Sequence, residues 1–251
     1  MKVIEPEKKY DFWFKNGHVI DPAQNIDKVC DVLVKGNKIA AAPENGVVDP
    51  RDVKETVECN GYYVLPGLID HHAHFSWNFN VTGVEPDLYT LPSGVTSACD
   101  AGSTGSSGFE GFVRSTMQPA LITMKASINV ASGGLCTPQY MEDIRPENYD
   151  VKGLEDLFDR YPQWIYGLKL RLGKDISDGQ GVEPLKASVK LARHLNTRLS
   201  VHATYPLTPM ADIVNEMGPG DVLCHTFQKM GEHNILDENN RVRPEVWEAR
   251  K

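Results

Sequence analysis

From residue 62 onward, short apolar runs alternate with segments of helical spacing, and this alternation limits the folds open to the chain. The six apolar runs lie at 63–70, 95–100, 120–128, 165–171, 198–202 and 221–225. Helical spacing is clearest at 184–195 and at 209–217, just before Gly218. Strands that alternate with helices form parallel sheets, so residues 62–251 are predicted to form an α/β domain.

The residues before this region predict a smaller unit. Apolar stretches between residues 10 and 60 are short and are separated by turn signals. Asn16-Gly17 is typical of a β-hairpin, and Asp21-Pro22 and Gly36-Asn37 indicate two further turns. We therefore expect a small β domain over 1–61 and the α/β domain over 62–251.

Composition narrows the range of functions. The chain has 251 residues, a net charge of −8 and 41% hydrophobic residues, as in ordinary soluble globular proteins. It has no basic stripe, so a nucleic-acid partner is not expected, and no apolar run long enough to span a membrane. The charged N-terminus lacks the apolar segment of a secretory signal. Five scattered cysteines without a CxxC pair fit a reducing cytoplasm. The expected partner is a small-molecule substrate; a homo-oligomer stays open.

Asp70-His71-His72-Ala73-His74 is the strongest chemical signal in the sequence. Alternate residues of a strand share a face, so His72 and His74 point the same way at the end of an apolar strand. Two imidazoles at this spacing can bind one zinc ion, although a pair of surface histidines is the simpler alternative. His71 points to the other face and is expected to pack. Asp70 shares the face of the ligands and is in position to orient a histidine.

Three further residues follow at the ends of later strands. Lys169 lies inside an otherwise apolar strand, where its amine either extends to the strand end or takes part in a metal site. Beside two metal ions the amine can take up carbon dioxide, and the resulting carbamate can bridge both ions. His202 and His225 end the fifth and sixth runs. A lone histidine in such a place is usually a core residue, but two on consecutive strands favour metal ligands.

The stretch 65–74 resembles the first-strand signature of the amidohydrolase superfamily, and 94–105 resembles that superfamily's second strand. The phrases at 167–171 and 234–238 resemble its amidohydrolase/deacetylase subgroup. The resemblance implies a (β/α)8 TIM-type barrel with a small β-sandwich built from both chain ends. It also implies two zinc ions, or another divalent metal, bridged by carboxylated Lys169 and held by the four histidines of the strand ends, with a metal-bridging hydroxide that cleaves an amide or ester bond.

The sequence departs from this family pattern at its C-terminal end, where neither the eighth-strand aspartate nor the C-terminal contribution to the β-sandwich is found. Only six strands are counted, so the barrel is expected to be incomplete at its C-terminus, without the eighth-strand aspartate that acts as ligand and general base. Related dihydroorotases carry an arginine two residues after the histidine pair, where this chain has Ser76. A deacetylase of a small carboxylate-bearing N-acyl or O-acyl compound is therefore favoured. The alternatives are a dihydroorotase-like cyclic amidohydrolase, a non-catalytic scaffold and an inactive fragment.

Other polar residues carry weaker signals. Arg171 shares the inward face of its strand with Lys169 and either binds a substrate carboxylate or forms a surface ion pair. His233 is at best a weak substrate contact, His194 is expected on a solvated helix face, and His18 is expected to be structural. The glycine- and serine-rich stretch 102–108 is predicted to be a loop at the top of the barrel.

Overall fold

The computed structural model describes residues 7–41, 48–80, 82–136, 142–177 and 179–251. The chain divides into two units, Met1–Leu68 and Ile69–Lys251. The domain boundary expected after residue 61 lies within the first unit. The N-terminal residues 1–6, in which no signal peptide is expected, lie outside the described part. No helix among the described residues is long and apolar enough to cross a membrane.

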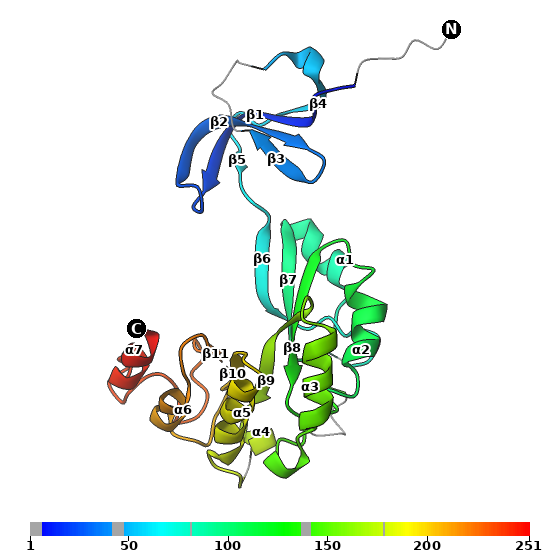
Figure 1. Cartoon of the computed structure of the whole chain (residues 1–251). Coiled ribbons are helices and arrows are strands. Elements are labelled where there is room, and N and C mark those ends of the chain that lie inside the picture. Colours follow the sequence, from blue (N-terminus) through cyan, green and yellow to red (C-terminus); the bar gives the residue numbers. More distant parts are fainter. Residues whose placement is uncertain (1–6, 42–47, 81, 137–141, 178) are drawn as a thin grey trace. The chain divides into compact units, whose positions relative to one another are not determined.

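The first unit is a five-stranded sheet (Figure 1). Its strands are β1 (Tyr10–Asp21), β2 (Ile26–Lys35), β3 (Lys38–Ala41), β4 (Val53–Glu58) and β5 (Tyr63–Val64), and a 3-10 turn, η1, covers Pro50–Asp52. The order is β3-β2-β1-β4, with β5 also paired to β1. Strands β1 and β2 are antiparallel, whereas β4 and β5 run parallel to β1. Trp13, Leu33 and Val53 form a small buried cluster.

The hairpin predicted at Asn16-Gly17 is wrong, because β1 continues through these residues. The register against β2 shifts between Phe14 and Gly17, which makes this point a β-bulge. Asn16 adopts a φ of 60°, and its main-chain N–H donates to Asp31 Oδ1 at 2.9 Å. A dipeptide that tolerates positive φ thus serves a bulge as well as a turn. The turns expected at Asp21-Pro22 and Gly36-Asn37 are confirmed, since β1 ends at Asp21 and β2 ends at Lys35.

The second unit contains a six-stranded sheet in the order β11-β10-β9-β8-β7-β6. Its strands are β6 (Leu68–Ala73), β7 (Val95–Ala101), β8 (Thr123–Asn129), β9 (Ile165–Arg171), β10 (Leu199–His202) and β11 (Val222–Cys224). From β7 to β11, neighbouring strands pair in parallel. Sequence order and spatial order agree, as in an open part of a (β/α) barrel. The predicted α/β fold class is therefore confirmed, with six barrel strands present.

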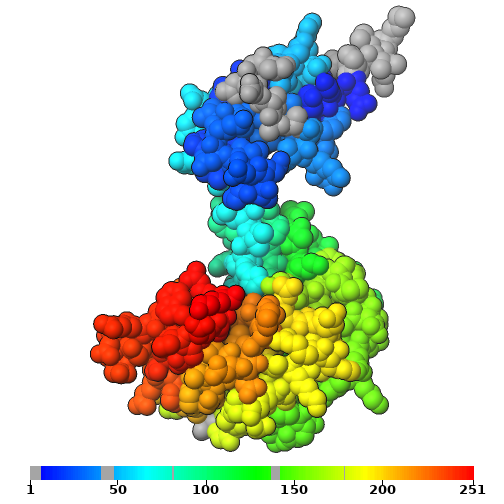
Figure 2. Space-filling model, turned by 60° about the vertical axis from the view of Figure 1, so that its left-hand side comes forward, coloured from blue at the N-terminus to red at the C-terminus, as the bar shows by residue number. Residues whose placement is uncertain are grey.

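Helices connect these strands along the chain (Figure 1). They are α1 (Pro86–Thr90), α2 (Phe109–Phe112), α3 (Val151–Arg160), α4 (Lys174–Ser177), α5 (Glu183–His194), α6 (Met210–Glu216) and α7 (Pro244–Arg250), with short η2 (Leu91–Ser93), η3 (Val113–Met117) and η4 (Pro146–Asn148). Helix α5 packs against β9 and β10, and α6 contacts α7. Figure 2 shows the C-terminal residues, in red, continuing the surface of the preceding orange segment.

The predicted strand and helix positions agree with most of these bounds. One correction concerns the first apolar run, 63–70, which is divided between two sheets. Tyr63–Val64 pairs with β1 in the small sheet, and Pro66 and Gly67 separate it from β6. The proline lacks an N–H for a sheet hydrogen bond, so one continuous strand is interrupted there. Apolar residues from β8, β9 and β10, including Ile128, Leu168 and Val201, form the buried core of the second unit.

Candidate metal centre

Four histidines and one lysine lie at the carboxyl ends of strands in the second unit. His72 is in β6 and His74 follows it, Lys169 is in β9, His202 ends β10, and His225 follows β11. Because the carboxyl ends of parallel strands meet at one edge, these side chains come close together. The ring centroid of His225 lies 4.6 Å from that of His72 and 4.5 Å from that of His202, and the His72 and His74 centroids are 5.8 Å apart.

Lys169 is buried, with a relative exposure of 1%. Its Nζ lies 3.7 Å from Cys224 Sγ, which is the one hydrogen-bond contact of this amine among the described residues. Burial lowers the pKa of Lys169 below its ordinary value, so the neutral amine is easier to reach than in an exposed lysine. Gly102 permits this packing, because a Cβ at that position would lie 2.5 Å from Lys169 Cβ.

The histidines are held in their neutral form. Burial, together with the nearby charge of Lys169, lowers the pKa of His72 to about 3 and that of His74 to about 4. Burial and the charge of Arg171 lower the pKa of His202 to about 2. Neutral imidazoles each keep one nitrogen lone pair, which is the form that binds a metal ion.

The residues present fit a divalent metal ion. His72 Nε2 is buried and has no hydrogen-bond partner among the described residues. A buried imidazole nitrogen without a partner is costly unless another group satisfies it. Within the described residues, no three His, Cys, Asp or Glu side chains are arranged so that they could hold a metal ion together. The donor set is nevertheless the kind that suits zinc, because neutral histidines predominate and a buried lysine lies beside them.

Ser103 and Asp100 form a hydrogen-bonded chain that ends at Nδ1 of the His74 ring. Ser103 Oγ lies 2.9 Å from His74 Nδ1 and donates to Asp100 Oδ2 at 2.8 Å. Asp100 is fully buried and also accepts from the main-chain N–H groups of Phe75 and Ser103, each at 2.7 Å. Burial raises the pKa of Asp100, and the hydrogen bonds from these two residues oppose that rise. Asp100 and Ser103 lie within the stretch 94–105, but their role was missed, because it depends on how the loop turns back toward β6.

Glu142 and Arg171 form an ion pair near Lys169. The Glu142 side chain is only 3% exposed, and its Oε1 accepts from Asn129 Nδ2 at 2.6 Å. Burial raises the pKa of Glu142, and the positive charge of Arg171 counteracts this effect. The Arg171 side chain is 25% exposed. No local pattern in the sequence indicated Glu142, which meets Arg171 only through the path of the loop.

The remaining candidate residues lie as follows. Asp70 Oδ1 accepts from the main-chain N–H of His72 at 3.0 Å rather than from a histidine ring, so its predicted orienting role is untested. The exposed His71 ring packs edge-on against Tyr166. His194 pairs with Glu155, His18 pairs with Asp27, and His233 is half-buried after β11. Ser76 is fully buried, and its Oγ has no partner among the described residues.

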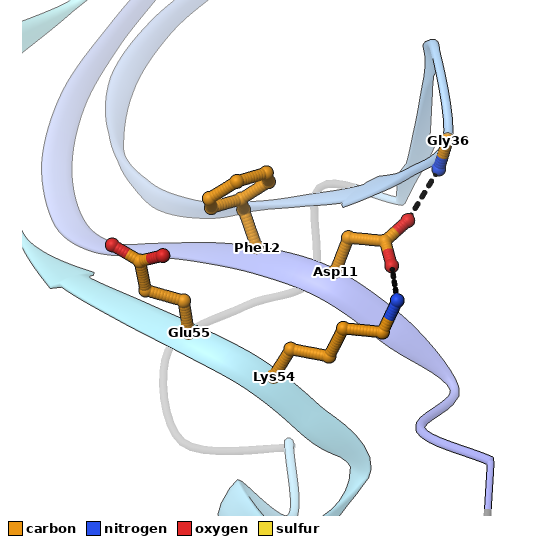
Figure 3. Close-up of a pocket in the computed structure, with 5 residues that line it drawn as sticks. All are labelled: Asp11, Phe12, Gly36, Lys54 and Glu55. Atoms are coloured by element: carbon orange, nitrogen blue, oxygen red, sulfur yellow. Dashed lines mark hydrogen bonds and ion pairs between the residues drawn. The ribbon is translucent and has the colours of Figure 1, made fainter.

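A hollow on the small sheet is lined by Asp11, Phe12, Gly36, Lys54 and Glu55. Figure 3 shows Asp11 bonded both to Lys54 Nζ and to the main-chain N–H of Gly36. The carboxylate therefore links β1 to β4 and to the β2–β3 turn. We interpret these contacts as structural.

No family model matches the chain. A deacetylase of Agrobacterium fabrum is 28% identical over 211 residues, which cover 84% of this chain and 52% of the relative. A crystal structure of a dihydroorotase aligns with a TM-score of 0.78 and 26% identity over 89% of this chain and 59% of that one. A crystal structure of an adenine deaminase aligns with a TM-score of 0.83 and 25% identity over 96% of this chain and 63% of that one. The chain spans about half the length of the Agrobacterium relative.

The six parallel strands in sequence order match part of the barrel in these amidohydrolase-type structures. In sequence and fold the chain is similar to proteins of the amidohydrolase superfamily. Its curated relatives over most of its length are deacetylases, at about 28% identity.

Proposed function

We propose that this chain supplies the metal-binding strand ends of a zinc-dependent deacetylase acting on a small compound with a carboxylate. The observation that carries the proposal is the group of four neutral imidazoles around the buried amine of Lys169. The relatives named as deacetylases support the acyl group as the target. When bound, zinc lowers the pKa of water and polarises a carbonyl group.

Each residue of the group would have its own role in binding metal or substrate. His72 and His74 would hold one ion and His202 and His225 the other. Lys169, carboxylated by carbon dioxide, would bridge them: its neutral nitrogen attacks the carbon and releases a proton. The lowered pKa of Lys169 favours this reaction, because only the neutral amine has the required lone pair. Arg171, partly exposed at the end of β9, would bind the substrate carboxylate.

A dihydroorotase-like activity on a cyclic amide is the second candidate. The structural similarity to a dihydroorotase favours it. Ser76 weighs against it, because the residue at the position of the dihydroorotase arginine is fully buried here and carries no charge.

Zinc analysis of the purified chain tests the metal centre directly. We expect up to two zinc ions per chain, fewer in Lys169→Ala, and an unchanged content in Lys125→Ala. Lys125 is a matched control on the neighbouring strand β8, where its Nζ donates to Gln163 O. A Lys169→Ala chain with normal zinc content would contradict the bridging role. Hydrolysis of dihydroorotate, with none on acetylated carboxylates, would favour the second candidate.

A further inference from the structure

We propose that Asp100 and Ser103 are positioning residues that hold His74 in the tautomer with its proton on Nδ1, which leaves the Nε2 lone pair for a metal ion. The metal in this statement rests on the proposed function. The tautomer is a property of the chain alone and can be measured without metal.

The direction of the hydrogen bonds assigns the tautomer. Ser103 Oγ has a single proton, which it donates to Asp100 Oδ2 at 2.8 Å. At its 2.9 Å contact with His74 Nδ1 the same oxygen can therefore only accept. Nδ1 must carry the proton of this contact, and in a neutral imidazole Nε2 is then unprotonated.

The contacts of Asp100 determine that the Ser103 hydroxyl is the donor in the hydrogen bond between these two side chains. Its Oδ2 accepts from the main-chain N–H of Phe75 at 2.7 Å, and its Oδ1 accepts from that of Ser103 at 2.7 Å. With donors on both oxygens, the carboxylate acts as an acceptor toward the hydroxyl. Phe75 follows His74 directly, so Asp100 holds the main chain next to His74 while Ser103 holds its ring.

Both supporting residues are inaccessible to solvent, Asp100 at 0% and Ser103 at 2% exposure. Water therefore cannot easily replace either hydrogen bond. Groups that orient a metal-bound histidine through its second nitrogen typically change metal affinity by about 10- to 100-fold when they are removed. Loss of the Ser103 hydroxyl should accordingly weaken zinc binding by about that factor.

The test combines nitrogen NMR of the metal-free chain with zinc titration against a chromophoric chelator. In the 15N-labelled chain, the ring signals that disappear in His74→Gln identify His74. We expect a protonated Nδ1 and an unprotonated Nε2 in the native chain, and a mixture of tautomers in Ser103→Ala. Zinc affinity should fall about 10- to 100-fold in Ser103→Ala and recover in part in Ser103→Thr, which keeps the hydroxyl.

Ser107→Ala is the matched control. Ser107 lies on the same loop, and its hydroxyl donates to Ser132 O rather than to a histidine. In the Ser107→Ala chain, neither the tautomer of His74 nor the zinc affinity should change. A proton found on His74 Nε2 in the native chain would overturn the assignment, even if the chain binds no zinc. Unchanged zinc affinity in Ser103→Ala would overturn the positioning role, even if the tautomer is as expected.

Discussion

The ion pair between Glu142 and Arg171 is asymmetric in its exposure to water. The Glu142 carboxylate is almost completely buried, whereas a quarter of the Arg171 side chain reaches solvent. Removing either partner leaves the other without its counter-charge. The cost depends on whether water can reach the charge that remains.

Replacement of each partner should therefore destabilise the chain to different extents. Arg171→Met leaves a buried carboxylate and should lower the free energy of unfolding by about 3 kcal/mol. Glu142→Gln leaves a partly solvated guanidinium and should cost about 1–2 kcal/mol. Urea unfolding of both variants and of the double variant measures these values. Equal losses in the two single variants, or strict additivity in the double variant, would contradict this account of the pair.

At the scale of secondary structure elements, Asp221 links three segments of the second unit. It precedes β11, pairs with Arg193 in the last turn of α5, and accepts from Leu199 N in β10 at 2.8 Å and from Gly218 N at 2.9 Å. Burial tends to raise the pKa of Asp221, but these hydrogen bonds outweigh it, so the pKa lies below its ordinary value of 3.8.

This lowered pKa predicts a pH-dependent contribution to stability. The folded-state pKa is below the unfolded one, so the stabilisation is fully present above pH 3.8 and is lost as pH falls through the folded value. Asp221→Asn should cost about 1–3 kcal/mol at pH 6. Urea unfolding of the native chain and this variant at pH 6 and pH 3 should show the difference shrinking at the lower pH. A constant difference would mean that the charge of Asp221 contributes nothing.

At the scale of the whole molecule, the six-stranded sheet has two edge strands among the described residues, β6 and β11. The side chains of Leu68 and Ile69 in β6 are exposed, at 50% and 74%. An edge strand with exposed apolar side chains and unpaired main-chain groups favours association with another chain.

We therefore expect the purified chain to self-associate as its concentration rises. Ile69→Lys places a charge on the edge strand and should shift sedimentation-velocity profiles toward monomer. Leu121→Lys, which replaces a residue that is 82% exposed on the loop before β8, serves as the control and should leave association unchanged. A native chain that stays monomeric at all concentrations would contradict the expectation.

The strand and helix positions could be predicted because their signals are local. The run at 165–171 coincides with β9, and the histidines at the strand ends lie near one another because parallel strands place their carboxyl ends at one edge. The two errors, at Asn16-Gly17 and in the run 63–70, arose where the same local pattern suits more than one arrangement. A dipeptide that favours positive φ fits a bulge or a hairpin, and sequence alone does not say to which sheet an apolar pair belongs.

The sequence by itself determined the class of fold and the candidate metal ligands, since both follow from spacing along single strands. Only the tertiary structure decided which side chains support them. Ser103 reaches His74 from the loop that follows β7 and is bonded to Asp100 near the end of that strand, and Glu142 reaches Arg171 from a loop that follows β8. Such contacts depend on the path of loops and on burial, which sets the pKa of Lys169 and the protonation of the histidines. The path of a loop and the burial of a side chain are not encoded in a periodic sequence pattern, so these contacts can be recognised only in the folded chain.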